Sequence, residues 1–194
     1  MGAETWLLVG LGNPGPQYAD TRHNVGAMVL DTLAGAQHWT YRRHKARAMV
    51  AEGRLAPLPG PKVLLAKPTT YMNVSGPPVR SLADYYGITP ERVVVVHDEL
   101  DIPFGSLRLK LGGGEGGHNG LRSVSAALGT REYLRLRVGV GRPPGRMDPA
   151  DYVLREFAKP ERQELDLVRA EAVDALEQLV REGLSATQQR VHAR

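Results

Sequence analysis

Apolar residues recur along the chain in short runs, separated by segments rich in glycine, proline and charge. These runs are rich in valine and leucine and are five to seven residues long, which is typical of β-strands. They predict strands at Trp6–Gly10, Met49–Gly53, Val63–Lys67, Val93–His97, Leu107–Leu111 and Leu134–Val140. Because several runs are apolar at successive positions, we expect a sheet that is covered on both faces.

Between these runs, apolar residues recur at helical spacing. The pattern predicts four helices, which begin at about Asn24, at Ser75, near Leu121 and at Pro160, with Gly183 ending the last. Strands that alternate with helices indicate an α/β fold, with a mixed, mostly parallel twisted sheet flanked by helices. We see no domain boundary in the proline-rich segment 57–61 or the basic loop 141–149, and expect residues 1–194 to form a single domain.

Composition narrows the classes of function. The 194 residues are 42% hydrophobic and 24% charged, as in ordinary soluble proteins. Cysteine is absent, which excludes disulfides, a thiol nucleophile and a cysteine–zinc site. No apolar run reaches the length of about 18 residues that suggests a membrane span, and the first residues lack signal-peptide features, so we expect a cytoplasmic protein. The formal net charge of +4 permits a polyanionic partner.

Four unusual segments follow predicted strands: 12–24, 68–76, 97–103 and 112–120. In open α/β sheets, ligands bind beyond the carboxyl ends of the strands, so these segments are candidates for a common site. Segment 112–120 has six glycines in nine residues, which leaves room for a bulky ligand to approach the backbone. A mobile turn without function would have the same composition.

The first of these segments contains a glycine spacing found in dinucleotide sites. Gly10 to Gly15 reads G-x-G-x-x-G, but no helix pattern follows until about Asn24. The second predicted strand does not end in the acidic residue that would bind a ribose, and no Walker A loop is present. The sequence therefore argues against a dinucleotide pocket.

Three histidines, His23, His97 and His118, lie in the four segments. Together with Asp98 or Asp101 they offer the ligands of a metal centre, although no H-E-x-x-H type of spacing supports one.

Acid–base catalysis is the alternative that we favour. If the strand preceding Asp98 lies beside the first strand, this carboxylate could orient His23 as a general base. Ser75 and Ser106 lack the G-x-S-x-G elbow of serine hydrolases, so we expect an activated water rather than a covalent intermediate. A helix beginning near His23 would lower the pKa of the imidazole and favour its neutral form.

Asparagines occur in three of the same segments, at positions 13, 73 and 119. A carboxamide both donates and accepts hydrogen bonds without carrying charge, which suits an ester or a peptide backbone. Each of them could instead serve only turn geometry. Their shared location with His23 and Asp98 favours a role in a site.

These motifs resemble bacterial peptidyl-tRNA hydrolases. The resemblance rests on Gly10–Gly15 with Tyr18 and Thr21–Asn24, on Lys67–Gly76, on His97–Asp101 and on Gly112–Leu121, in family order. It covers residues 6 to 154, with Tyr71 where family members often carry phenylalanine. It implies hydrolysis of the ester between a peptide and the 3′-terminal ribose of tRNA, which frees the tRNA for reuse in translation, by a monomer without metal or other cofactor.

The resemblance also implies roles for individual residues. His23 is the general base, Asp98 keeps it basic and oriented, and Asn13 senses the blocked α-amino group. Asn73 and Asn119 bind the substrate's 3′ end and peptide backbone. The remaining positions line the cleft (Tyr18, Tyr71, Met72 and His118) or hold the tRNA 5′ phosphate and acceptor stem (Arg108, Lys110 and Arg137). An RNA-binding module without activity and a small-molecule esterase are the alternatives.

Overall fold

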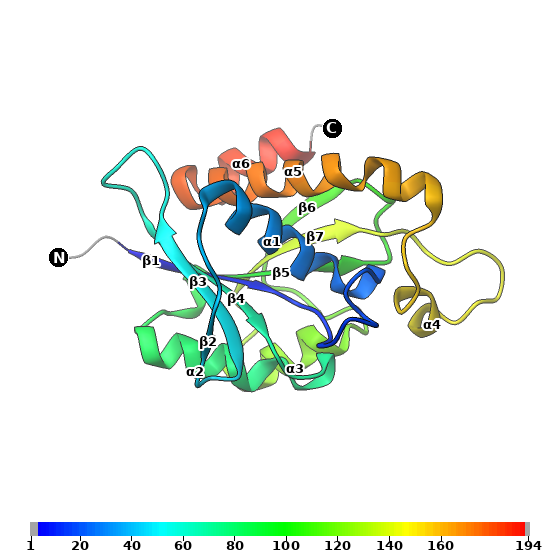
Figure 1. The fold of residues 1–194 in the computed structure, drawn as a ribbon, viewed down its shortest axis with the longest axis horizontal. Helices are drawn as coiled ribbons and strands as arrows, with labels where there is room; N and C mark the ends of the chain where they lie inside the picture. The colour runs from blue at the N-terminus through cyan, green and yellow to red at the C-terminus, as the bar shows by residue number, and fades with distance from the viewer. Residues whose placement is uncertain (1–3, 193–194) are drawn as a thin grey trace.

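A mixed seven-stranded sheet forms the middle layer of the molecule (Figure 1). The computed structural model describes residues 4–192, and within them the strands follow the order β2-β3-β4-β1-β5-β7-β6. Their bounds are β1 Thr5–Gly10, β2 Arg42–His44, β3 Ala48–Arg54, β4 Lys62–Pro68, β5 Val93–Glu99, β6 Leu107–Leu111 and β7 Leu134–Gly139.

The sheet confirms the predicted mixed, mostly parallel arrangement. The central strands β4, β1, β5 and β7 are parallel, whereas β3 and β6 run against their neighbours and β2 runs against β3. Five of the seven described strands therefore point the same way. The predicted neighbourhood of the first strand and the strand before Asp98 is also found, since β1 pairs with β5. Strand β2 was not predicted, because its sequence Arg-Arg-His has no apolar residue.

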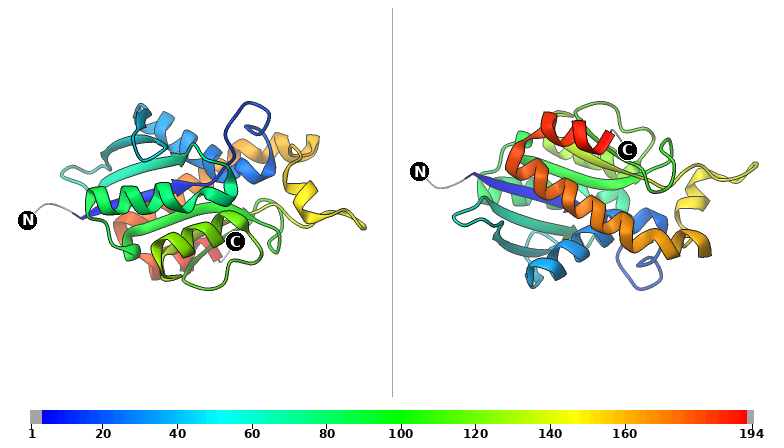
Figure 2. Two further views of the ribbon diagram at one scale, coloured as in Figure 1. Left: turned by 90° about the horizontal axis from the view of Figure 1, so that it is seen from below. Right: turned by 90° about the horizontal axis from the view of Figure 1, so that it is seen from above.

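Helices cover both faces of the sheet (Figure 2). Helices α1 (Val25–Gln37), α5 (Lys159–Glu182) and α6 (Leu184–His192) pack on one face, around a buried cluster that includes Leu8, Val94 and Val96. Helices α2 (Gly76–Tyr86) and α3 (Asn119–Leu128) pack on the other, over Leu7, Val9 and Val95. Residues of β1 and β5 thus alternate between two apolar layers, which explains why their sequences are apolar throughout.

Four helices match the expected ones, and two short helices were missed. Helix α4 (Pro149–Val153) has five residues, too few to produce a helical period. Helix α6 begins directly after Gly183, which ends α5 as predicted. None of the helices between residues 4 and 192 is long and apolar enough to cross a membrane.

Two glycines bring the start of α1 close to the sheet. A Cβ on Gly26 would lie 2.1 Å from the carbonyl oxygen of Val96, and a Cβ on Gly10 would lie 2.6 Å from that of Gly26. Only glycine permits these contacts between helix and strand backbones. Gly10 is therefore needed for packing, and the close approach sets the turn before α1 against the carboxyl end of β5.

Candidate active site

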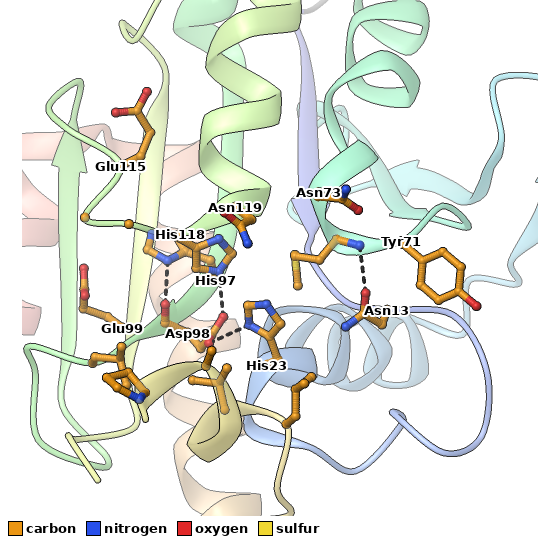
Figure 3. Close-up of a pocket in the computed structure, with 18 residues that line it drawn as sticks. Asn13, His23, Tyr71, Asn73, His97, Asp98, Glu99, Glu115, His118 and Asn119 are labelled. Carbon is orange, nitrogen blue, oxygen red and sulfur yellow. Dashed lines mark hydrogen bonds and ion pairs between the residues drawn. The ribbon is translucent and has the colours of Figure 1, made fainter. Parts of the chain in front are cut away.

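The carboxyl ends of β1, β4 and β5 border a pocket of about 460 Å³ (Figure 3). All four segments singled out in the sequence contribute to its lining, together with a fifth that follows β7. The lining includes Asn13, His23, Tyr71, Met72, Asn73, His97, Asp98, His118, Asn119 and residues of α4. The expected convergence of these loops at one edge of the sheet is found.

His23 and Asp98 form a hydrogen-bonded pair at the floor of this pocket. His23 lies in a short 3-10 helix, Arg22–Asn24, directly before α1, and Asp98 is the sixth residue of β5. His23 Nδ1 lies 2.8 Å from Asp98 Oδ2, and only 2% of the Asp98 side chain is exposed. With Nδ1 engaged by the carboxylate, Nε2 remains for a group in the pocket.

The pKa of His23 is raised above its usual 6.5, so the expected lowering is wrong. Burial alone would lower the pKa, but the adjacent Asp98 charge and its hydrogen bond outweigh burial. Burial opposes ionisation of Asp98, but His23 and a second histidine, His118, lower its pKa, so the carboxylate is ionised at neutral pH. The helix terminus does not decide the direction, because a full charge at hydrogen-bond distance exceeds the partial charge of a helix end.

Asp98 binds a second histidine through its other oxygen. His118 Nε2 lies 2.8 Å from Asp98 Oδ1. The Nδ1 atom of His118 accepts hydrogen bonds from the backbone N–H groups of Gly120 and Leu121, at 3.0 and 3.3 Å, and thereby caps α3. His118 thus links the glycine-rich loop to the carboxylate that holds His23, a connection that the sequence did not reveal.

His97 is the third histidine of this group and is fully buried. Its Nδ1 donates to the backbone oxygen of Asp98 at 2.8 Å. Burial, with a smaller effect of the nearby His118, lowers the pKa of His97 to about 3. His97 is therefore neutral at physiological pH, and it lines the site without acting as an acid or base.

The geometry favours a hydrogen-bonded trio over a metal centre. His23, Asp98 and His118 bring three possible ligand atoms within 4.8 Å of one another. Each histidine nitrogen, however, lies 2.8 Å from an Asp98 oxygen, whereas two ligands about 2.1 Å from one tetrahedral ion would be roughly 3.4 Å apart. His97 and Asp101, the other candidate ligands, are engaged by the Asp98 backbone and by Arg142.

Asn13 presents its amide nitrogen to the pocket. Its side-chain oxygen accepts from the backbone N–H of Met72 at 2.8 Å, which leaves the NH₂ group free to donate. Its backbone is held by the buried side chain of Asn24, which bonds to both Asn13 N and Asn13 O at 2.9 Å. Asn24 was missed as a site residue, although it stands in the Thr-Arg-His-Asn motif.

The other expected cleft residues differ in how directly they border the pocket. Tyr71, Asn73 and Asn119 are exposed at its rim, and neither asparagine side chain bonds to another residue in the part of the chain described. Tyr18 does not line the pocket but packs edge-on against Tyr71, with ring centres 6.5 Å apart. We therefore place Tyr18 behind Tyr71.

The expected basic residues lie together on neighbouring strands. Arg108 pairs in register with Arg137 across β6 and β7, and Lys110 lies two residues further on the same face. Lys110 and Arg137 line a second, smaller cavity of about 220 Å³ that shares His97, Glu99 and Gly116 with the main pocket. Arg137 is also paired with Glu99 at 3.0 Å. Arg108 lines neither cavity.

One wall of the main pocket was not expected from the sequence. It is apolar and comes from α4 and the residue after it: Pro149, Ala150, Val153 and Leu154. The available signal was Asp148 followed by Pro149, because aspartate is a preferred N-cap and proline a preferred first residue. Asp148 Oδ1 indeed accepts from Ala150 N at 3.0 Å.

The fold and the pocket together define an α/β protein with a histidine–aspartate site suited to acid–base chemistry. The family model described as Peptidyl-tRNA hydrolase matches residues 7–194. The chain belongs to the peptidyl-tRNA hydrolase family, a family of enzymes, as its sequence motifs predicted.

Related sequences and solved structures match this chain over nearly its whole length. The chain is 64% identical to the peptidyl-tRNA hydrolase of Pseudarthrobacter chlorophenolicus, over 97% of this chain and 96% of the relative. It is 58% identical to that of Kineococcus radiotolerans, with 98% of each covered. The crystal structure of peptidyl-tRNA hydrolase from Acinetobacter baumannii superposes with a TM-score of 0.90 at 35% identity, covering 100% of this chain and 97% of the other.

Proposed function

We propose that this chain hydrolyses the ester bond between a peptide and the 3′-terminal ribose of tRNA, and so releases free tRNA. The observation that carries the proposal is the orientation of His23, whose Nδ1 is held by the buried Asp98 carboxylate while Nε2 is left for the pocket. A base oriented in this way is what activation of a water molecule requires.

In the proposed reaction, His23 Nε2 takes a proton from water as the water oxygen attacks the ester carbonyl. The imidazolium that forms is stabilised by Asp98, which remains ionised. The tetrahedral intermediate then collapses, the ester C–O bond breaks, and the proton on His23 passes to the departing ribose oxygen. The products are a peptide carboxylic acid, which loses its proton to solvent and becomes the carboxylate, and a free hydroxyl, and the imidazole is neutral again. The amide nitrogen of Asn13 is a candidate donor to the oxyanion.

The orientation of Asn13 supports selectivity for a blocked α-amino group. Its NH₂ group can donate to the carbonyl oxygen of an N-acyl group. A free ammonium has only donors, so it cannot accept a hydrogen bond from this NH₂ group. An ammonium left without an acceptor in a pocket is costly. Asn73 and Asn119, with free carboxamides at the rim, would bind the peptide backbone and the 3′ end, and exposed Tyr71 offers a ring for base stacking.

The basic residues of β6 and β7 support a polyanionic substrate. Arg108, Lys110 and Arg137 share one face of the sheet beside the glycine-rich loop, as phosphate contacts next to a 3′-end pocket would require. We further propose a single domain that acts as a monomer in the cytoplasm. The packing of helices on both faces of one sheet supports the first of these statements.

The test compares purified enzyme on N-acetyl-aminoacyl-tRNA and on the same tRNA with a free amino group. We expect rapid release of only the acetylated amino acid, unchanged by EDTA, because the base needs no metal. Release of both amino acids would contradict the role given to Asn13, and loss of activity in EDTA would contradict the metal-free mechanism. Tight tRNA binding without release would instead favour an RNA-binding module, and cleavage of small esters alone would favour a general esterase.

Removing charge on β6 should weaken tRNA binding. For the double variant Arg108→Ala/Lys110→Ala, we expect a higher Kd and a plot of log Kd against log salt that is shallower by about 1 for each phosphate that the variant no longer neutralises. The matched control is Arg42→Ala/Arg43→Ala, which removes the same charge from exposed β2 at the opposite edge of the sheet. If the control changes the slope and the β6 variant does not, the RNA lies across the other edge.

A further inference from the structure

Arg22 precedes His23, but its side chain contacts the segment after β7. The side chain is only 7% exposed. Its Nη1 donates to the backbone oxygen of Tyr152 at 3.2 Å, and its Nη2 donates to Glu161 Oε1 at 3.1 Å. The guanidinium carbon lies 3.9 Å from the centre of the Tyr152 ring, a cation–π contact. One side chain therefore bonds to both α4 and the first turn of α5.

Backbone contacts of the same turn reinforce this connection. The N–H of Arg22 donates to the carbonyl oxygen of Arg155 at 3.0 Å. Thr21 and Glu156 form an isolated antiparallel bridge. Glu161 Oε1, which binds Arg22, also accepts from Ala158 N at 2.9 Å and so caps α5. The turn that carries His23 and the segment 152–161 are thus joined at several points, with the Arg22 guanidinium between them.

The segment held by Arg22 is the apolar wall of the pocket, which we define as residues 149–154. A helix of five residues is not stable by itself, so the position of α4 depends on its tertiary contacts. The loop 141–148 before it contains no helix or strand. Tyr152 faces away from the pocket, with its hydroxyl donating to Val140 O at 2.9 Å, while its neighbour Val153 lines the pocket.

We propose that Arg22 is a positioning residue for substrate binding. It holds the apolar wall at a fixed place relative to His23, so that a substrate in the pocket contacts the wall on one side and the imidazole on the other. Arg22 does not touch the substrate. The wall contacts the bound ester and its transition state alike, so its displacement weakens binding without slowing the chemical step. The kinetic part of this inference rests on the proposed function.

The experiment compares Arg22→Met and Arg22→Lys with a matched control, Arg169→Met. Arg169 of α5 also joins two helices, by bonds to Thr32 Oγ1 and Met28 O of α1, but it does not line the pocket. For Arg22→Met we expect KM for N-acetyl-aminoacyl-tRNA to rise about tenfold, with kcat changed less than about twofold. For Arg22→Lys, which keeps the charge opposite Glu161, KM should rise less. The inflection in the pH dependence of kcat/KM should stay in place, because the His23–Asp98 contact is intact.

Hydrogen exchange of the unliganded enzyme provides a readout that does not need activity. We expect faster exchange in residues 141–158 of Arg22→Met, with the central strands unchanged, and no such change in Arg169→Met. An unchanged KM, an equal KM change in the control, or a displaced pH inflection would each overturn the proposal, the last by showing that Arg22 acts on His23 itself. If Arg22→Met does not fold, Arg22→Lys decides between the same outcomes. Wild-type enzyme without hydrolytic activity would refute the proposed function, while exchange would still test the anchoring of the wall.

Discussion

Replacing His23 with asparagine is expected to lower kcat/KM for N-acetyl-aminoacyl-tRNA by about 10²- to 10⁴-fold, the usual contribution of a positioned general base. Asparagine can still donate to Asp98, but it has no basic nitrogen to take a proton from water. The effect should appear in kcat, because His23 acts on the attacking water rather than on the bound tRNA. Single-turnover hydrolysis and tRNA binding, measured on the same preparation, separate the two effects.

The matched control for this variant is His38→Asn. His38 lies at the carboxyl end of α1 with φ 59°, a left-handed conformation that asparagine tolerates well, and it does not line the pocket. We expect the control to hydrolyse substrate at the wild-type rate. Near-normal turnover by His23→Asn would show that another group activates the water.

Replacing Asp98 with asparagine should have the second largest effect, smaller than that of His23. The carboxylate would no longer stabilise the imidazolium. Removal of a hydrogen bond to a charged group costs about 1.5–3 kcal/mol, which corresponds to roughly 10- to 150-fold in rate. The pKa of His23 is raised chiefly because Asp98 outweighs burial, so the variant should have a lower pKa at this residue. Activity needs neutral His23, so the wild-type rate rises with pH through an inflection above 6.5, and the inflection of the variant should lie at lower pH.

Asp101→Asn is the control for the pH profile. Asp101 lies three residues further along, where it pairs with Arg142, and it does not line the main pocket. Its replacement should leave the inflection of kcat/KM in place. A profile of Asp98→Asn that coincides with the wild type would mean that the carboxylate does not control the protonation of His23.

The sequence was sufficient for the parts of the fold that depend on local pattern. The runs around Leu8, Leu65 and Val95 are apolar at successive positions, because these strands are buried on both faces of the sheet. Strand β2 and helix α4 have no such pattern. The first is polar, and the second is fixed by contacts with residues more than a hundred positions away, such as that of Arg22 with Tyr152.

The candidate site, like the fold, could be predicted from the sequence only in part. The contact between His23 and Asp98 could be predicted from the sequence, because the motifs that contain them follow two strands that were expected to be neighbours. The direction of the His23 pKa shift did not, because it depends on a 2.8 Å contact that sequence cannot measure. The capping of α3 by His118 and the role of Asn24 behind Asn13 likewise depend on side-chain orientation, which no spacing rule contains.

The cap that His118 places on α3 restricts where a proton can reside in the site. Its Nδ1 faces two backbone N–H groups and must keep its lone pair, so the ring is held in the tautomer with hydrogen on Nε2. A proton added to Nδ1 would point at two donors. Both ring nitrogens of His118 are engaged, whereas His23 has one nitrogen that no other residue in the described part of the chain binds. Proton exchange with a bound substrate therefore falls to His23, and His118 serves to fix the shared carboxylate to the first turn of α3.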